Sequence, residues 1–405
     1  MTSITILNRY FVVALSIFAA VLLIDLAKGK EMLAESTQLS LYLHNEFAPF
    51  QNWIVQEWFV FCSKPLFYVI SVFGFFALYF FNNKADALYF FLFLNYENVI
   101  GNLMKLTYAD TRPCFENMEV SIIGCSCAFG KPSGHSSASN VFYTLLYFEF
   151  IHERNISPKI KTAIFVFTKW LIFNICLSRI YFGAHSFNQV IMGYMLGEVL
   201  ISIYLNLKPY KHLLRTALSP SSYKDIQIKN SVCNFIISLQ TIIALFLIIG
   251  WYMRVNYFEQ SPYHPYAHSN CVKKCFKRPT KLLSNIHLIS AGFFNSVIFI
   301  FLLIKFKVRN ADVPLEENRR ARLQLSIILQ RAVIFIICMI PLGIAARIST
   351  EHGFLTYLLV NALLILFSVN LVVVSGILMK RRNCAFAGDF GFVEEKLTFD
   401  SLIED

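Results

Sequence analysis

Residues 163–205 read AIFVFTKWLIFNICLSRIYFGAHSFNQVIMGYMLGEVLISIYL, which is two apolar runs joined by a short polar break. Each run, 163–182 and 187–205, is apolar and close to the length of about 20 residues that a helix needs to cross a lipid bilayer. Arg179 stands at the end of the first run and His185 stands in the break, and both side chains are costly near a bilayer unless they are paired or functional. The stretch therefore predicts two membrane helices with a candidate site at the turn between them.

The composition of the whole chain agrees with this interpretation. The 405 residues are 56% hydrophobic and only 15% charged, and the mean hydropathy is +0.55. Soluble domains carry about 25% charged residues, so soluble, disordered and disulfide-scaffold classes are excluded. We expect an all-α, polytopic membrane helical bundle with about nine to ten transmembrane helices. The expected spans are 10–27, 59–82, 87–105, 137–152, 163–182, 187–205, 232–252, 288–305, 326–346 and 354–379.

The first apolar run, 10–27, admits two interpretations. It could be a signal peptide, but it lacks a clear small-x-small cleavage site and exceeds the usual length of a signal's apolar region. An uncleaved first helix is therefore favoured. The stretch that follows, 28–57, mixes Glu, Asn, Gln and Trp with apolar residues and predicts a helix that lies at the membrane interface.

The net charge of +11 is distributed unevenly along the chain. Four basic segments fall on one side of the predicted membrane, which the positive-inside rule assigns to the cytoplasm. The opposite side holds the loop 106–136 and the basic loop 253–287, which does not fit the rule. The charge thus orients the chain in a membrane and does not indicate a nucleic-acid partner. The four cytoplasmic segments are 153–162, 206–231, 305–324 and 380–382.

Three polar clusters lie on the predicted non-cytoplasmic side. Taken singly, each has an ordinary explanation: Lys105 and Arg112 as snorkelling boundary residues, His135 as a helix-start side chain, and Arg179 with His185 as an interfacial pair. The clusters are Lys105-Leu-Thr-Tyr-Ala-Asp-Thr-Arg112-Pro113, Lys131-Pro132-Ser133-Gly134-His135, and Ser178-Arg179-Ile-Tyr-Phe-Gly-Ala-His185-Ser-Phe-Asn188-Gln189.

Together these clusters supply the groups that phosphoryl transfer needs. Cationic side chains and the backbone N–H groups at a helix start compensate the charge on phosphate oxygens. One imidazole can attack phosphorus and a second can protonate the leaving oxygen. No carboxylate cluster that could hold Mg²⁺ lies near the motifs, so we expect neither a metal nor another cofactor.

The pattern Lys-x6-Arg-Pro, then Pro-Ser-Gly-His, then Ser-Arg-x5-His resembles the type 2 phosphatidic acid phosphatase superfamily. This superfamily also contains glucose-6-phosphatases, dolichyl-diphosphate phosphatases and vanadium haloperoxidases, and the resemblance covers about residues 60–205. It implies that His185 is a nucleophile that forms a phosphohistidine and that His135 is the general acid. It also implies that phosphate oxygens are held by Lys105, Arg112, Ser133, Gly134 and Arg179.

One position departs from the pattern. Many superfamily members carry Asp four residues after the nucleophilic His, and this chain carries Gln189. An amide oxygen can still accept a ring N–H and fix the imidazole tautomer. The run around Gln189 resembles the glucose-6-phosphatase and dolichyl-diphosphate phosphatase branches.

The resemblance divides the chain into a leading anchor or signal with an interfacial segment (1–58), a six-helix phosphatase core (59–205), additional transmembrane helices (206–379) and a cytoplasmic tail (380–405). We expect a metal-independent hydrolase of a lipid phosphate or lipid diphosphate. One alternative is a phosphosugar substrate, as in glucose-6-phosphatases. A second alternative is a non-catalytic, lipid-binding family member. The expected location is the endoplasmic reticulum or another endomembrane, with the site on the lumenal side.

Overall fold

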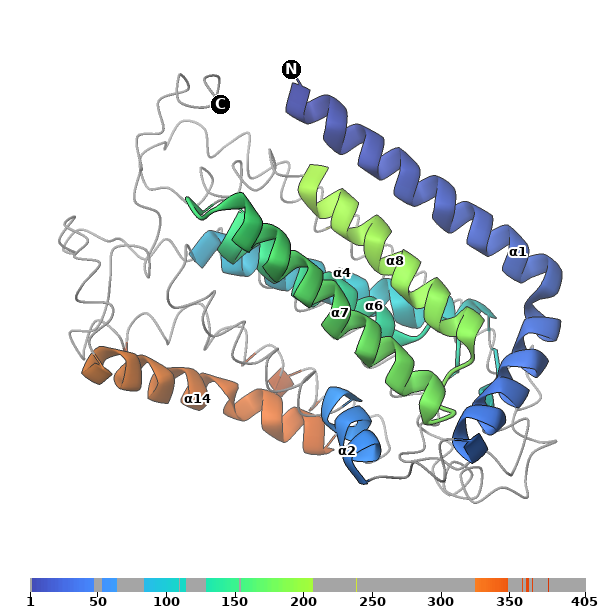
Figure 1. Ribbon diagram of the computed structural model, residues 1–405. Helices are drawn as coiled ribbons and strands as arrows, with labels where there is room; N and C mark the ends of the chain where they lie inside the picture. The colour runs from blue at the N-terminus through green and yellow to red at the C-terminus, as the bar shows by residue number, and fades with distance from the viewer. Residues whose placement is uncertain are drawn as a thin grey trace. The chain divides into compact units, whose positions relative to one another are not determined.

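Helices are the only regular elements in the residues that the structure describes, so an all-α fold is confirmed for this part of the chain. This computed structural model describes residues 2–46, 53–63, 84–108, 110–113, 129–152, 154–206 and 325–348, with a few single positions beyond them. The helices are α1 (Thr2–Glu46), α2 (Trp53–Phe61), α4 (Lys84–Tyr108), α6 (Gly134–Tyr147), α7 (Pro158–Tyr181), α8 (Phe187–Asn206) and α14 (Leu325–Ile348), and they are drawn in Figure 1.

Three of the described helices are long and apolar enough to cross a membrane. They are Arg9–Leu39 within α1, the whole of α7 and the whole of α8, which coincide with three of the predicted spans. The predicted spans 87–105 and 137–152 are also helical, as α4 and as α6 with a π-helical turn after it. The predicted span 59–82 is described only as far as residue 63, and 232–252, 288–305 and 354–379 lie almost wholly outside the described residues, so the total of nine to ten spans stays a prediction.

The first helix is longer than the sequence suggested. No break separates the apolar run from residues 28–46, because α1 continues as one helix from Thr2 to Glu46. The segment 28–46 contains no Pro and is rich in Leu and Glu, which favour helix, so the end of the apolar run does not end the helix. Residues 28–46 are thus helical and continuous with the apolar run, and the interfacial position of 28–57 stays a prediction.

The chain folds as two compact units, and the first contains α1, α2, α6, α7 and α8. In this unit α8 packs against α1 and α6, while α7 packs against α6 and α2. Close contact between α6 and α8 depends on two glycines: a Cβ at Gly193 would lie 2.4 Å from the Ser133 carbonyl oxygen, and one at Gly197 would lie 2.9 Å from Asn140 Nδ2. The second unit contains α14, which has Pro341 inside it.

The first unit contains a cluster of paired polar side chains between its helices and exposes large apolar side chains. Lys169 Nζ lies 2.7 Å from Glu198 Oε1 and 3.0 Å from Asn140 Oδ1, and Tyr10 of α1 donates to Glu198 as well. Large apolar side chains face outward on the same helices, including Phe173 of α7. Partly buried, paired ionic groups beside an apolar surface are an arrangement that a lipid environment favours. The three long apolar helices are compatible with an integral membrane protein.

Candidate active site

The turn between α7 and α8 places a histidine at the end of the helix pair. Gly183 adopts a positive φ of 58°, a conformation that favours glycine and ends α7. The Arg179 carbonyl oxygen accepts hydrogen bonds from the backbone N–H groups of Ala184 (3.0 Å) and His185 (3.2 Å). The backbone of His185 is therefore held between the last turn of α7 and the first turn of α8.

Both ring nitrogens of His185 have defined neighbours, and the side chain is only 2% exposed. Nδ1 lies 2.8 Å from the Gly130 carbonyl oxygen, which can only accept, so Nδ1 carries the proton. In the neutral ring, Nε2 then holds the lone pair, and it lies 3.1 Å from Arg112 Nη1. The geometry presents an unprotonated Nε2 beside a guanidinium.

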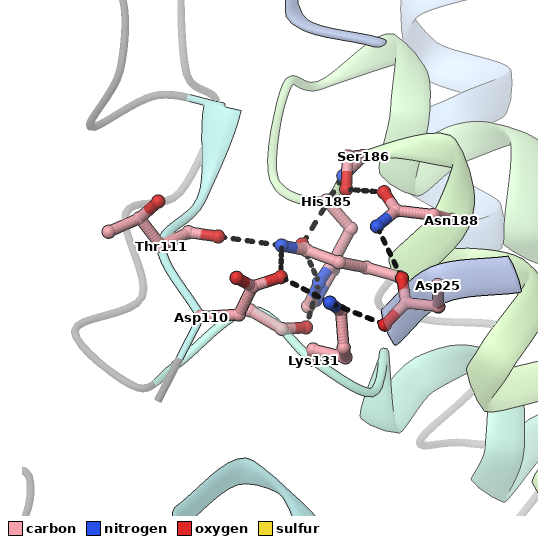
Figure 2. Close-up of polar contacts among 9 residues, drawn as sticks. Asp25, Asp110, Thr111, Lys131, His185, Ser186 and Asn188 are labelled. Atoms are coloured by element: carbon pink, nitrogen blue, oxygen red, sulfur yellow. Dashed lines mark hydrogen bonds and ion pairs between the residues drawn. The ribbon is translucent and has the colours of Figure 1, made fainter. Parts of the chain in front are cut away.

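Gln189 supports this arrangement from the first turn of α8. Its Oε1 accepts a hydrogen bond from the Ser186 backbone N–H at 3.3 Å, as in a Ser-x-x-Gln capping box, and lies 3.3 Å from His185 Nδ1. Its Nε2 donates to the Thr111 carbonyl oxygen at 2.6 Å; Figure 2 shows Thr111 and His185 in this region. A Cβ on Gly130 would lie 2.4 Å from Gln189 Nε2, so glycine is needed where the two segments meet. The backbone of Gly130 and the amide of Gln189 thus share the orienting role.

Cationic side chains converge on the same region from three segments. Arg112 is buried and donates to the carbonyl oxygens of Ala184 (2.7 Å) and Phe129 (3.2 Å). Arg179 is buried and donates to Ser63 Oγ at 2.6 Å. The Lys105 ammonium lies against the start of α6, because a Cβ at residue 134 would be 3.2 Å from its Nζ. A helix start flanked by cations is suited to bind an anion.

Both histidines of the site are neutral at neutral pH. Burial lowers the pKa of His185 well below its ordinary value, and the nearby cations of Arg112 and Arg179 lower it further. Burial lowers the pKa of His135 as well, again assisted by Arg179, Lys105 and Arg112. A dianionic phosphoryl group among these cations would oppose their charge and raise the pKa of His135 toward its ordinary range.

The residues that form this site also carry a family signature. The model of the PAP2 superfamily matches residues 86–213, which contain all three motifs. Over residues 86–213 the chain is similar to the PAP2 superfamily. The resemblance inferred from the motifs is confirmed over this segment, and members of the superfamily are generally phosphatases. No curated protein and no solved structure matches the chain.

Within the PAP2 segment, most of the predicted site residues lie together. Ser133 has a different setting from the others: its N–H donates to the Gln189 carbonyl oxygen at 2.9 Å, and its Oγ accepts from Ser136 at 2.9 Å. This residue joins the start of α6 to α8, and its phosphate-binding role stays a prediction. The residues that the structure brings together are Lys105, Arg112, Gly134, His135, Arg179, His185 and Gln189.

Some site residues have no counterpart in the predicted set. Ser63 lies before the PAP2 segment and contacts both Arg179, through its hydroxyl, and His135, through its backbone. Gly130 contributes its backbone carbonyl oxygen. Every residue has this group, so the sequence cannot indicate which one acts. Ser186, whose backbone N–H donates to Gln189 Oε1, is likewise absent from the predicted set. In the described segments, no group of three or more His, Cys, Asp or Glu side chains could hold a metal ion.

Replacing Gln189 by Asp, the residue that many relatives carry, should lower kcat rather than raise it. The shorter carboxylate cannot donate to the Thr111 carbonyl oxygen, and it would bring a second negative charge close to Asp110 Oδ2, now 3.4 Å from Gln189 Nε2. Loss of such a supporting contact costs about 10-fold to 100-fold in activity. Steady-state kinetics of Gln189→Asp would measure this loss.

The matched control is Asn206→Asp, which also converts an amide that donates to a carbonyl oxygen, but at the far end of α8. This control should keep the wild-type kcat. If Gln189→Asp were as active as the wild type, a donor at position 189 would be unnecessary.

Proposed function

We propose that this chain is an integral membrane phosphatase that hydrolyses a phosphate ester through a phosphohistidine at His185. The observation that carries the proposal is the state of His185, whose Nδ1–H is held by the Gly130 carbonyl oxygen while Nε2 lies beside Arg112. Fixing one nitrogen by a hydrogen bond leaves the other as the nucleophile.

The reaction would proceed in two displacements. In the first, the Nε2 lone pair of His185 forms a bond to phosphorus, the bond from phosphorus to the leaving oxygen breaks, and His135 gives that oxygen a proton. In the second, water loses a proton to His135 and attacks the phosphohistidine, which releases phosphate and restores His185. Arg112, Arg179 and Lys105 would compensate the charge on the phosphoryl oxygens, and no step calls for a metal.

A lipid phosphate or lipid diphosphate is the substrate class that we favour. The outward-facing side chains of α1 and α7 are apolar, and the site lies where α7 ends and α8 begins. A site at the end of membrane helices would meet a lipid headgroup directly. We place the protein in the endoplasmic reticulum or another endomembrane, with this end of the helices on the lumenal side.

A phosphosugar is the second candidate, because Gln189 matches the branch that includes the glucose-6-phosphatases. Purified protein assayed against phosphatidate, dolichyl diphosphate and glucose 6-phosphate separates these candidates. We expect the highest kcat/KM with one of the two lipids and inhibition by orthovanadate, which mimics five-coordinate phosphorus. A clear preference for glucose 6-phosphate would reverse the ranking. Failure to hydrolyse any of the three would favour a non-catalytic, lipid-binding role.

A further inference from the structure

Helix α1 precedes the PAP2 segment in sequence, yet it packs along α8. Most of its side chains near the middle are apolar and exposed, such as Leu23, Ile24 and Leu26. Asp25 lies among them but is only 5% exposed. A carboxylate buried in an apolar helix is costly unless it is paired, and such a residue is usually retained for a function.

The Asp25 carboxylate is fully engaged by residues of the PAP2 segment. Oδ2 lies 2.8 Å from Lys131 Nζ, and Oδ1 accepts a hydrogen bond from Asn188 Nδ2 at 2.9 Å (Figure 2). Gly29, one turn along α1, leaves room for the carboxylate, since a Cβ there would lie 3.3 Å from Oδ1. Lys131 Nζ also lies 2.8 Å from Asp110 Oδ2, so two carboxylates share one ammonium.

Lys131 is charged in this setting. Burial lowers its pKa, but the hydrogen bonds and charges of Asp110 and Asp25 outweigh burial, and the pKa is raised above its ordinary value. The ammonium therefore holds both carboxylates at neutral pH.

Both partners of Asp25 are connected to His185 through the backbone and one or two hydrogen bonds. Lys131 directly follows Gly130, whose carbonyl oxygen accepts the His185 Nδ1–H. On the other side, Asn188 accepts a hydrogen bond from Ser186 Oγ at 2.5 Å, and Ser186 directly follows His185. Asp25 thus braces the two backbone segments that flank the imidazole. Displacing either segment would move Nε2 or weaken the bond that fixes the tautomer.

We propose that α1 is an uncleaved part of the catalytic unit and that Asp25 is a positioning residue for His185, acting through Lys131 and Asn188. This inference rests on the proposed function in one respect, namely that His185 is the nucleophile. It assigns a role in the reaction to a helix outside the segment that the PAP2 superfamily model matches.

The test compares Asp25→Asn with Tyr10→Phe in the full-length protein. The Tyr10 hydroxyl also connects α1 to α8, by donating to Glu198, which is 13 residues after His185 in the sequence. Tyr10→Phe is therefore the matched control for a weakened contact between α1 and α8. Asp25→Asn should lower kcat by about 10-fold to 100-fold with little change in KM, the range for a lost supporting contact, and Tyr10→Phe should keep the wild-type kcat. Should Asp25→Asn not fold, Asn188→Leu removes the second contact of Asp25 and should lower kcat in the same way.

Orthovanadate affinity, measured by calorimetry, gives a readout that does not depend on turnover. Asp25→Asn should weaken vanadate binding by about tenfold, because a displaced imidazole coordinates vanadium poorly. A wild type that binds vanadate but hydrolyses none of the three substrates would contradict the proposed function and leave the effect of Asp25 measurable. A wild type that neither binds vanadate nor turns over would contradict both proposals. Unchanged kcat and vanadate affinity in the folded Asp25 or Asn188 variant would overturn the role of Asp25 alone.

Discussion

Replacing His185 by alanine should lower kcat by about 10⁴-fold or more, the loss that follows removal of a catalytic nucleophile. The remaining cations can still bind a phosphate ester, but no other described side chain takes the position of Nε2 beside Arg112. The measurement is phosphate release by the purified variant at saturating substrate. Binding should persist in part, so KM should change far less than kcat.

His152 offers a matched control for this experiment. It is an exposed histidine in the π-helical turn after α6, at the opposite end of that helix from His135. His152→Ala should keep the wild-type kcat, and thermal unfolding should show that both alanine variants are folded. If His185→Ala retained most of its activity, the nucleophile would have to be another group.

Replacing Arg112 by lysine should lower kcat/KM by about 10²-fold to 10³-fold, the range for losing one preorganised donor to a developing charge. The planar guanidinium reaches the Ala184 carbonyl oxygen, the Phe129 carbonyl oxygen and His185 Nε2 at once. A lysine ammonium has a single nitrogen and cannot span these groups, so buried carbonyl oxygens would lose their donors. The deficit would be measured as kcat/KM with the best substrate.

The same exchange at Arg154 is the control, because Arg154 is exposed in the turn before α7. Arg154→Lys should leave kcat/KM unchanged. Equal activity of Arg112→Lys and the wild type would mean that one positive charge suffices and that the geometry of the guanidinium is irrelevant.

The parts of the fold that depend on local sequence could be predicted. The spans 163–182 and 187–205 follow from uninterrupted apolar runs of the right length, and the structure confirms them as α7 and α8. The end of α1 could not be found in this way, because hydropathy falls after Ala27 while helix-forming residues continue to Glu46. Hydropathy measures the solvent that a segment prefers, and helix formation depends on other properties of its residues.

In the candidate site, too, residues in local motifs could be predicted and a residue brought in by long-range packing could not. Arg112, His135, Arg179 and His185 stand in motifs whose spacing can be recognised, and the structure brings them together. The contribution of Asp25 could not be predicted, since its partner Lys131 is 106 positions away in sequence. A contact of that separation arises only from the packing of α1 on α8.

The role of Gln189 becomes clearer in three dimensions. From sequence alone, the amide oxygen of Gln189 was expected to accept the ring N–H of His185 in place of a carboxylate. In the structure the Gly130 carbonyl oxygen is the nearer acceptor for His185 Nδ1, at 2.8 Å against 3.3 Å for Gln189 Oε1. The amide has a second function that a carboxylate cannot perform, which is to donate to the Thr111 carbonyl oxygen. The departure from the family pattern is therefore compensated locally.

Trapping of the covalent intermediate tests the central claim most directly. Protein quenched during turnover of a ³²P-labelled substrate should carry an acid-labile, base-stable phosphate, and mass spectrometry should locate it on His185. His185→Ala should carry no label under the same conditions, and His135→Ala should accumulate it if the second displacement is slowed. Label on a serine or a carboxylate, or turnover by the wild type with no phosphorylated histidine, would contradict the account.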